Sequence, residues 1–317
     1  MKFQDSRLKT FSYLFALILL TSFLSLMLFL LLRLAISNFW QYSQSDLISD
    51  NITFDVAPER KLILLISLDG MGSDLIGEDT PYLSSLLQRS QSSATLDMQS
   101  LMQSETMPAH LSMVTGLTQE HHGFYENSVD ETTPVLTTKT IFDHAKTKGY
   151  KYYGFVTKDK LLYLFGTNQN ENIISIEDGS GDVLKDIDNL INADASRILT
   201  FVHFRDADKY GHLLGWGSLG QRAAIRILDN NLRQFITDIN YEFANYERYI
   251  IITADHGGEG LTHGSGCTSC RRIPLLVVSE NRDESYKLDA RPYNIYDVAC
   301  VVMDLIGNQE DLNMDCE

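Results

Sequence analysis

Acidic and histidine side chains gather in three short stretches of the chain, each at the end of an apolar run or directly after one. The stretches are "LISLDG" (65–70), "FRDADKYGHLLGW" (204–216) and "TADHGGEGLTHGSG" (253–266). Their acids and histidines of interest are Asp69, Asp206, Asp208, His212, Asp255, His256 and His263. Carboxylate and imidazole ligands without thiolate are typical of Zn²⁺ and Mn²⁺ sites. Two such ions can hold the attacking and leaving oxygens of a phosphoryl displacement, so the pattern predicts a site for two divalent cations, with Zn²⁺ preferred.

A fourth stretch, "SETMPAHLSMVTGL" (104–117), places a threonine just before an apolar helical run. The simplest role for Thr106 is that of a helix cap, with Pro108 near the first helical position. The start of a helix also presents unpaired N–H groups that attract anions. Because a metal ion could hold the Thr106 hydroxyl as an alkoxide, we predict that Thr106 is the nucleophile of the metal site.

Short apolar runs alternate with amphipathic stretches after residue 59, which is the pattern of an α/β fold. Strands are expected at 61–70, 151–157, 197–204, 248–255 and 273–279. Helices are expected around 80–90, 107–115, 139–148, 182–192, 218–239 and 293–306. The acids and histidines lie at the ends of three of these strands. We therefore predict a mainly parallel sheet sandwiched by helices, with the site at the carboxyl ends of the strands.

Four motifs resemble, in their order, those of the alkaline phosphatase superfamily, and of its type I phosphodiesterase/nucleotide pyrophosphatase branch in particular. They are "LISLDGM", "TMPAHLSMVTGLTQEHHGFYEN", "DADKYGH" and "TADHGGEGLTHG". The resemblance covers roughly residues 60–306. It implies an alkaline phosphatase-like core and a metal-dependent phosphodiesterase or pyrophosphatase that works through a phospho-threonine intermediate.

The resemblance also implies roles for individual residues. The ligands of one metal ion would be Asp208, His212 and His263, and those of the other would be Asp69, Thr106, Asp255 and His256. Asn127 would donate a hydrogen bond to a phosphoryl oxygen. Four further residues match no ligand position and receive no chemical role: Asp206, His110, His121 and His122.

The substrate and the acceptor of the phosphoryl group stay open. The short spacing from His256 to His263 also resembles the glycosylphosphatidylinositol ethanolamine-phosphate transferases, so a phospho-headgroup transferase is one alternative. A metal-free domain that only binds a partner is another. We expect a phosphodiester substrate, either a small molecule or a lipid headgroup. A preference for monoesters would need a cation at the phosphoryl group, and the basic residues considered for it are Arg205, Lys209, Arg271 and Arg272.

The N-terminal segment differs from the rest of the chain. Residues 10–32 contain no charged side chain over 23 positions, which as a helix is long enough to cross a bilayer. Lys2, Arg7 and Lys9 precede it, so the positive-inside rule places the N-terminus in the cytoplasm. We predict a cytoplasmic tail (1–9), a transmembrane signal anchor (10–36), a polar stalk (37–59) and an extracytoplasmic catalytic domain (60–317).

Charge and cysteine content limit the partners and the compartment. The formal net charge is −16, which argues against binding to DNA or RNA. The four cysteines fit an oxidising compartment, and their proximity in the sequence favours the pairs Cys267–Cys270 and Cys300–Cys316. The expected partners are therefore the membrane and a phosphodiester, not a nucleic acid.

Overall fold

The structure is a computed structural model. It describes Met27 and residues 60–168, 170, 172–176, 179–186, 195–264, 266–281, 285–307 and 314–315. Apart from Met27, these residues fall in the second of two units of the chain, Pro58–Glu317. The predicted tail, anchor and stalk lie outside the described residues, again apart from Met27. No helix in the described part of the chain is both long and apolar enough to span a membrane.

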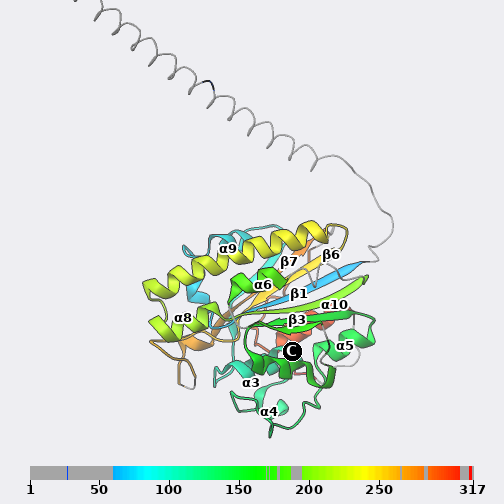
Figure 1. Cartoon of the computed structure of the whole chain (residues 1–317), viewed down its shortest axis with the longest axis horizontal. Helices are drawn as coiled ribbons and strands as arrows, with labels where there is room; N and C mark the ends of the chain where they lie inside the picture. The colour runs from blue at the N-terminus through cyan, green and yellow to red at the C-terminus, as the bar shows by residue number, and fades with distance from the viewer. Residues whose placement is uncertain are drawn as a thin grey trace, which may run out of the picture. The chain divides into compact units, whose positions relative to one another are not determined.

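The described strands form one seven-stranded sheet in the order β2-β7-β6-β1-β5-β3-β4 (Figure 1). They are β1 (Lys61–Leu68), β2 (Ser92–Gln99), β3 (Lys151–Val156), β4 (Ile173–Ser175), β5 (Arg197–Phe204), β6 (Glu247–Thr253) and β7 (Arg272–Glu280). The central strand, β1, runs parallel to β5 on one side and to β6 on the other. These three strands are almost entirely buried, which is why their sequences are apolar nearly without interruption.

The sheet is mainly parallel, as the sequence predicts, and it is mixed because one described strand, β7, runs against the others. The five strands from β6 to β4 are parallel, whereas β7 pairs antiparallel with both β6 and β2. The five expected strands are all present. The two unexpected ones, β2 and β4, are edge strands that remain largely accessible, so their sequences lack a strong apolar pattern.

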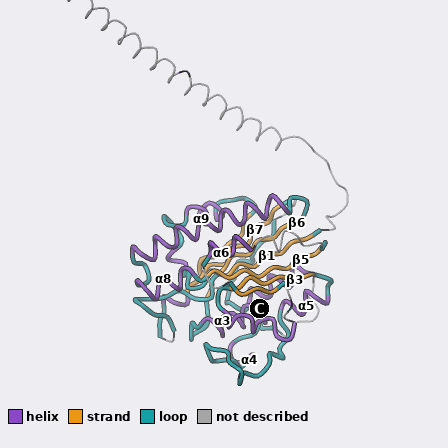
Figure 2. The backbone as a smooth tube through the Cα atoms, in the orientation of Figure 1, coloured by secondary structure: helices purple, strands orange, loops and turns teal. Residues whose placement is uncertain are grey.

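Helices cover both faces of the sheet (Figure 2). They are α2 (Pro81–Leu87), α3 (Thr106–Thr115), α4 (Gln119–His122), α5 (Ile141–Thr147), α6 (Ser180–Asp186), α8 (Asp206–Leu214), α9 (Leu219–Glu242) and α10 (Asp297–Ile306). Three 3₁₀ helices, η1 (Ser73–Leu75), η2 (Asp159–Asn168) and η3 (Ser269–Arg271), lie in the connections. Contacts of α9 with α2, α6 and α8 form one layer, and contacts among α3, α5 and α10 form the other. The six expected helices are present within their described residues; α4 and α8 are additional.

Two helices help to hold the elements around the site: α3, which begins at Thr106, and α9, which packs on α8. All ten residues of α3 are buried, and the helix ends where Gly116 takes the left-handed conformation, with φ at 70°. Ser218 caps α9, since its side chain accepts a hydrogen bond from Gln221 N. The apolar face of α9 packs on the sheet and on α8, which fixes the segment that carries two of the predicted ligands.

Candidate active site

Three strand ends meet at one edge of the sheet, as the sequence predicts. Asp69 follows β1, Asp208 lies in the first turn of α8 after β5, and Asp255 follows β6. Asp69 N donates to Phe204 O at 2.9 Å, and Asp208 N donates to Asp69 O at 2.9 Å. Gly70 N donates to Asp255 Oδ1 at 3.1 Å. Only glycine fits there, because φ is +76° and a Cβ atom would lie 2.7 Å from Asp208 Cα.

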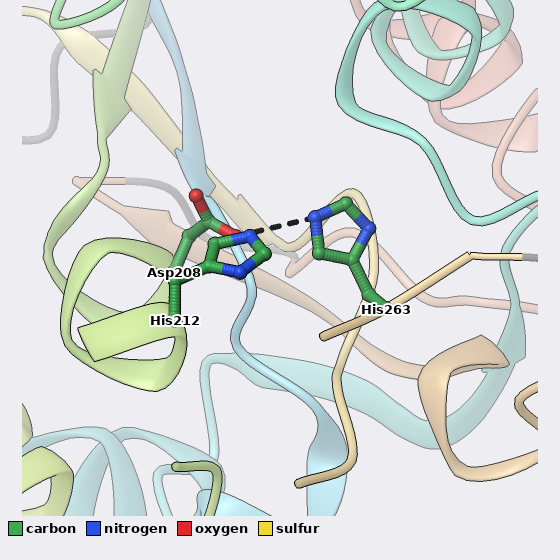
Figure 3. Close-up of side chains that lie close together, drawn as sticks. All are labelled: Asp208, His212 and His263. Carbon is green, nitrogen blue, oxygen red and sulfur yellow. Dashed lines mark ion pairs between the residues drawn. The ribbon is translucent and has the colours of Figure 1, made fainter. Parts of the chain in front are cut away.

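Asp208, His212 and His263 form an outer group (Figure 3). Asp208 and His212 lie one turn apart on α8, and His212 Nε2 is 3.3 Å from Asp208 Oδ1. His263 comes from the loop after β6, and its Nε2 is 3.6 Å from the same oxygen. The three ligand atoms lie within 4.8 Å of one another. The His212 side chain is 44% exposed, so the outer group is open to solvent.

Asp69, Asp255 and His256 form an inner group whose side chains are completely buried. His256 Nε2 lies 3.5 Å from Asp69 Oδ1 and 3.4 Å from Asp255 Oδ2. Asp208 borders this group as well, because ligand atoms of Asp69, Asp208 and His256 also lie within 4.8 Å of one another. The inner and outer groups are therefore neighbours that meet at Asp208.

The three histidines of these groups are oriented in the same way. In each ring Nδ1 donates to a backbone carbonyl oxygen: His212 to Leu261 at 2.9 Å, His256 to Gly257 at 2.8 Å, and His263 to Ser104 at 2.7 Å. A carbonyl oxygen only accepts, so Nδ1 carries the hydrogen and the neutral ring keeps a lone pair on Nε2. This arrangement is typical of histidines that bind metals through Nε2.

Several buried atoms of the two groups lack a hydrogen-bond partner among the described residues. They are Asp69 Oδ1, Asp208 Oδ1, Asp255 Oδ2 and His256 Nε2. Such atoms cost free energy unless something binds them, and all four are electron-pair donors. A divalent cation would satisfy them. The oxygen and imidazole donors fit Zn²⁺ or Mn²⁺, so the residues present suit the predicted metals.

Lys158, which the sequence analysis did not consider, contacts both groups. Its Nζ lies 2.6 Å from Asp69 Oδ2, 2.8 Å from Asp208 Oδ2 and 3.4 Å from Thr106 Oγ1. A single atom thus contacts a carboxylate from each group and the predicted nucleophile. The sequence held a signal for this position, because Lys158 follows the strand expected at 151–157 and so comes to the same edge of the sheet.

Burial and charge move the pKa values of the inner carboxylates in opposite directions. Burial, with the Asp69 charge in addition, raises the pKa of Asp255 well above its usual range. Burial also acts to raise the pKa of Asp69, but the Lys158 ammonium and a hydrogen bond from His203 outweigh it and hold this pKa well below its usual range. Burial would lower the pKa of Lys158, yet the neighbouring carboxylates raise it overall, so the ammonium stays charged.

The histidine pKa values also differ between the groups. Burial lowers the pKa of His256, and burial together with the His256 charge lowers the pKa of His263 to about 4. His212 shows the opposite shift, because the protonated ring can donate from Nε2 to the Asp208 carboxylate, which raises its pKa. Near neutral pH the two buried rings are therefore in the neutral form that a metal ion requires.

Thr106 is the first residue of α3 and is buried. It is not the helix cap of the simplest interpretation, because the N-cap residue is Glu105. His110 Nδ1 donates to Thr106 O at 2.8 Å, and His110 Nε2 lies 2.8 Å from Ser67 Oγ. His110, to which no chemistry was assigned, thus ties the first turn of α3 to β1 and fixes the position of Thr106.

His203 is a second buried histidine that the sequence analysis did not single out. Its Nε2 donates to Asp69 Oδ2 at 2.9 Å, and its Nδ1 lies 2.8 Å from Thr157 Oγ1. The ring therefore holds one oxygen of Asp69 and leaves Oδ1 directed to His256. Within the strand "RILTFVHF" it has no pattern that distinguishes it from a core residue.

Asn127 lies beside the start of α3. Its Oδ1 accepts from Met107 N at 3.1 Å and from Lys160 Nζ at 2.7 Å, and its backbone O accepts from Lys160 Nζ at 2.9 Å. Its Nδ2 donates to Glu105 Oε2. The amide predicted to contact a phosphoryl oxygen is thus positioned by an ammonium on one side and a carboxylate on the other.

The other residues considered from the sequence have contacts elsewhere. Among the acids and histidines, Asp206 accepts from Ser180 N at 2.9 Å, His121 pairs with Asp315, and His122 contacts Ser112. Among the basic residues, Arg205 donates to Thr157 O, Lys209 lies over the Tyr210 ring, and Arg272 pairs with Asp97. Among the described residues, the lysines and arginines with side-chain hydrogen bonds to Thr106 or Asn127 are Lys158 and Lys160.

The disulfide predicted between Cys267 and Cys270 is confirmed. It lies in the loop that supplies His263, and Gly257 N donates to Cys270 O at 2.7 Å, which ties the two sides of this loop together. The second predicted pair involves Cys316, which lies outside the described residues.

Comparison with known sequences identifies relatives of this chain. Residues 63–163 and 174–268 match the family described as type I phosphodiesterase / nucleotide pyrophosphatase. Human ectonucleotide pyrophosphatase/phosphodiesterase family member 5 is 24% identical over 264 residues, which is 75% of this chain and 52% of that protein. The chain thus spans about half the length of this curated relative.

Two solved structures illustrate the similarity of fold. Murine ectonucleotide pyrophosphatase/phosphodiesterase 5, as an inactive variant in complex with AMP, superposes with a TM-score of 0.66 at 13% identity, covering 81% of this chain and 98% of that one. The C-terminal periplasmic domain of EptC from Escherichia coli gives a TM-score of 0.60 at 16% identity, covering 79% and 83%. These likenesses support an alkaline phosphatase-like core.

Proposed function

The chain belongs to the type I phosphodiesterase / nucleotide pyrophosphatase family, and from this premise we propose that it is a metal-dependent phosphodiesterase with Thr106 as its nucleophile. The observation that carries the proposal is the convergence of the two ligand groups on one hydroxyl. Lys158 Nζ is in contact with Asp69, Asp208 and Thr106 Oγ1 together.

The residues have three roles: metal ligands, nucleophile, and donor of a hydrogen bond to a phosphoryl oxygen. The outer group and the inner group would each hold one divalent cation, and Thr106 Oγ1 would complete the inner set. Bound there, the cations would lower the pKa of the Thr106 hydroxyl and neutralise charge on the phosphoryl oxygens. Zn²⁺ is the ion we propose: the domain of EptC that shares this fold is known in a complex with Zn.

The reaction follows from this placement. Thr106 Oγ1 loses its proton and bonds to phosphorus, while the leaving oxygen departs on the opposite side and takes up a proton. Asn127 Nδ2 donates to a phosphoryl oxygen as negative charge increases on it. Water then attacks phosphorus, the bond to Thr106 breaks, and its hydroxyl is restored.

Removal of the nucleophile tests this proposal. With the full-length chain and Zn²⁺, we expect Thr106→Ala to lower the hydrolysis of bis(p-nitrophenyl) phosphate by about 10³-fold or more, since such losses follow removal of one member of a catalytic unit. Thr106→Ser keeps a hydroxyl and should retain measurable activity. Near-normal turnover by Thr106→Ala, with zinc still bound, would contradict the assignment.

A phospho-headgroup transferase is the second candidate. The short spacing between His256 and His263 favours it, as the sequence analysis notes. It differs only in the second step, where an alcohol replaces water as the group that attacks the phospho-threonine. Product analysis with an alcohol acceptor present separates the two, because a transferase forms a new phosphodiester and a hydrolase does not.

We also propose that residues 10–36 anchor the chain in a membrane with the catalytic domain outside the cytoplasm. The Cys267–Cys270 disulfide supports this location, because disulfides persist in oxidising compartments. The EptC domain that resembles this chain is periplasmic. A lipid headgroup or a small phosphodiester would then be the substrate on that side of the membrane.

A further inference from the structure

Lys160 carries a positive charge beside Asn127, whose Oδ1 also accepts a hydrogen bond from Met107 N at the start of α3. Its ammonium donates to two oxygens of Asn127, both neutral, at 2.7 and 2.9 Å. Within the described residues no acidic group lies within ion-pair distance of this ammonium. The side chain is only partly accessible, so water screens the charge incompletely.

A second ammonium lies close by. Lys158 has Asp69 and Asp208 as counter-ions, and it contacts Thr106 Oγ1 at 3.4 Å. Burial and the Lys158 charge lower the pKa of Lys160, which is the effect of two like charges in one half-buried space. If divalent cations bind Asp69 and Asp208, these carboxylates also neutralise the Lys158 ammonium less completely. The surroundings of Thr106 therefore favour a ligand with more than one negative charge.

Phosphate esters differ in this property. A diester carries one negative charge, whereas a monoester, whose second pKa is about 6, carries close to two at neutral pH. We propose that the site also hydrolyses dianionic phosphate monoesters, and that Lys160 is the residue that confers this activity. The inference rests on the proposed function, because it uses the same nucleophile and the same ligand groups.

Lys160 is placed to act on the phosphoryl group through contact with Asn127. The amide of Asn127 lies between Lys160 and Glu105, so a phosphoryl oxygen that accepts from Asn127 Nδ2 replaces the Glu105 carboxylate as its partner. The Lys160 ammonium then lies one amide group away from that oxygen. The Lys160 ammonium stabilises the additional negative charge of a bound monoester, and it stabilises a bound diester less.

The monoester reaction balances without a further reactant. Thr106 Oγ1 bonds to phosphorus, the bond from phosphorus to the ester oxygen breaks, and the proton lost by the hydroxyl is matched by one gained by the leaving alcohol. Water then supplies the oxygen that replaces Thr106 on phosphorus and returns a proton to the hydroxyl. The products are the alcohol and inorganic phosphate.

Two substrates with the same leaving group test the proposal. Full-length protein with Zn²⁺ is assayed at about pH 8, where the monoester is dianionic, with p-nitrophenyl phosphate and with bis(p-nitrophenyl) phosphate. We expect Lys160→Met to lower kcat/KM for the monoester by about tenfold, because the ammonium acts on the phosphoryl oxygen electrostatically across one amide group. The value for the diester should fall by a clearly smaller factor, because the variant loosens the hold on Asn127 but removes no interaction with a second negative charge, and Lys160→Arg should keep monoester activity.

Lys209→Met is the matched control, because Lys209 is exposed on α8 and its ammonium lies over Tyr210. It should leave both activities unchanged. If the wild type cleaves the diester but releases nothing from the monoester above the level of Thr106→Ala, the inference is wrong and the proposed function stands. An equal loss on both substrates in Lys160→Met would also overturn it. Failure of the wild type on both substrates would count against the proposed function itself.

Discussion

The inner and outer groups have similar donors but very different surroundings. Asp69, Asp255 and His256 are completely buried at the ends of two adjacent central strands, whereas the outer group lies on α8 and a loop and has one imidazole 44% exposed. Burial leaves the inner group with polar atoms that nothing else can satisfy. We therefore expect an inner cation, if bound, to be held tightly and an outer one to exchange more readily.

The largest effect is expected from Asp255→Asn in the inner group. The change should lower diester hydrolysis by about 10³-fold or more by removing a ligand. The same change should raise the melting temperature of the metal-free protein, by about 2–4 °C, because an amide costs less free energy to bury than a carboxyl group whose pKa burial raises, and the amide can donate to His256 Nε2. Activity assays and thermal unfolding with a chelator present measure the two effects.

Asp206→Asn is the control, since Asp206 accepts hydrogen bonds from Ser180 away from both groups. It should reduce stability and leave zinc content unchanged. A lower melting temperature for metal-free Asp255→Asn would show that the inner carboxylates stabilise the fold without a cation. This would contradict the expectation that they cost free energy when no cation is bound.

A smaller effect is expected from His212→Ala in the outer group. The ring is half-exposed, so its removal leaves no large cavity and the fold should persist. At limiting zinc, activity should fall by about 100-fold and one ion per chain should be lost, and excess Zn²⁺ should restore part of the activity. Metal analysis across a zinc titration checks this. Loss of both ions together would contradict the expectation that the two groups bind their ions separately.

The smallest effect concerns a histidine outside both groups. Burial lowers the pKa of His122 to about 4, below the value of about 6.5 in an unfolded chain. Its contribution to stability is complete above about pH 6.5 and is lost progressively as the pH falls to about 4, because only the unfolded chain takes up the proton in that interval. His122→Gln should therefore reduce the pH dependence of the unfolding free energy of the metal-free protein between these values. An unchanged slope in urea unfolding would show that the pKa of His122 is not lowered in the folded protein.

The fold was predictable where burial imposes a pattern. The central strands have continuous apolar runs and α9 has a clear helical period, so both were expected. The direction of β7 was not, because "IPLLVVS" reads alike in a parallel or an antiparallel strand. The edge strands β2 and β4 were not predicted, because neither sequence shows a strong pattern of apolar residues.

The candidate site was predictable to the extent that its residues stand at strand ends. Five of the seven predicted ligand residues lie just after a strand or in the first turn of a helix, whereas His212 lies in the last turn of α8 and His263 in the loop after β6. The fold brings the acids and histidines among the seven into two neighbouring groups. Lys158, Lys160 and His203 were not found. Lysine after a strand resembles an ordinary surface residue, and a histidine within a buried strand resembles a core residue, until the distances to Asp69 and Asn127 are known.

The zinc content of the full-length wild-type chain is the most direct test of the two-group account. The protein is saturated with Zn²⁺, freed of excess metal and exposed to a chelator, with bound zinc measured over time. We expect two ions per chain. The ion of the exposed outer group should be removed quickly and the ion of the buried inner group slowly. A chain that binds no zinc, a single ion only, or two ions that leave at the same rate would contradict this account.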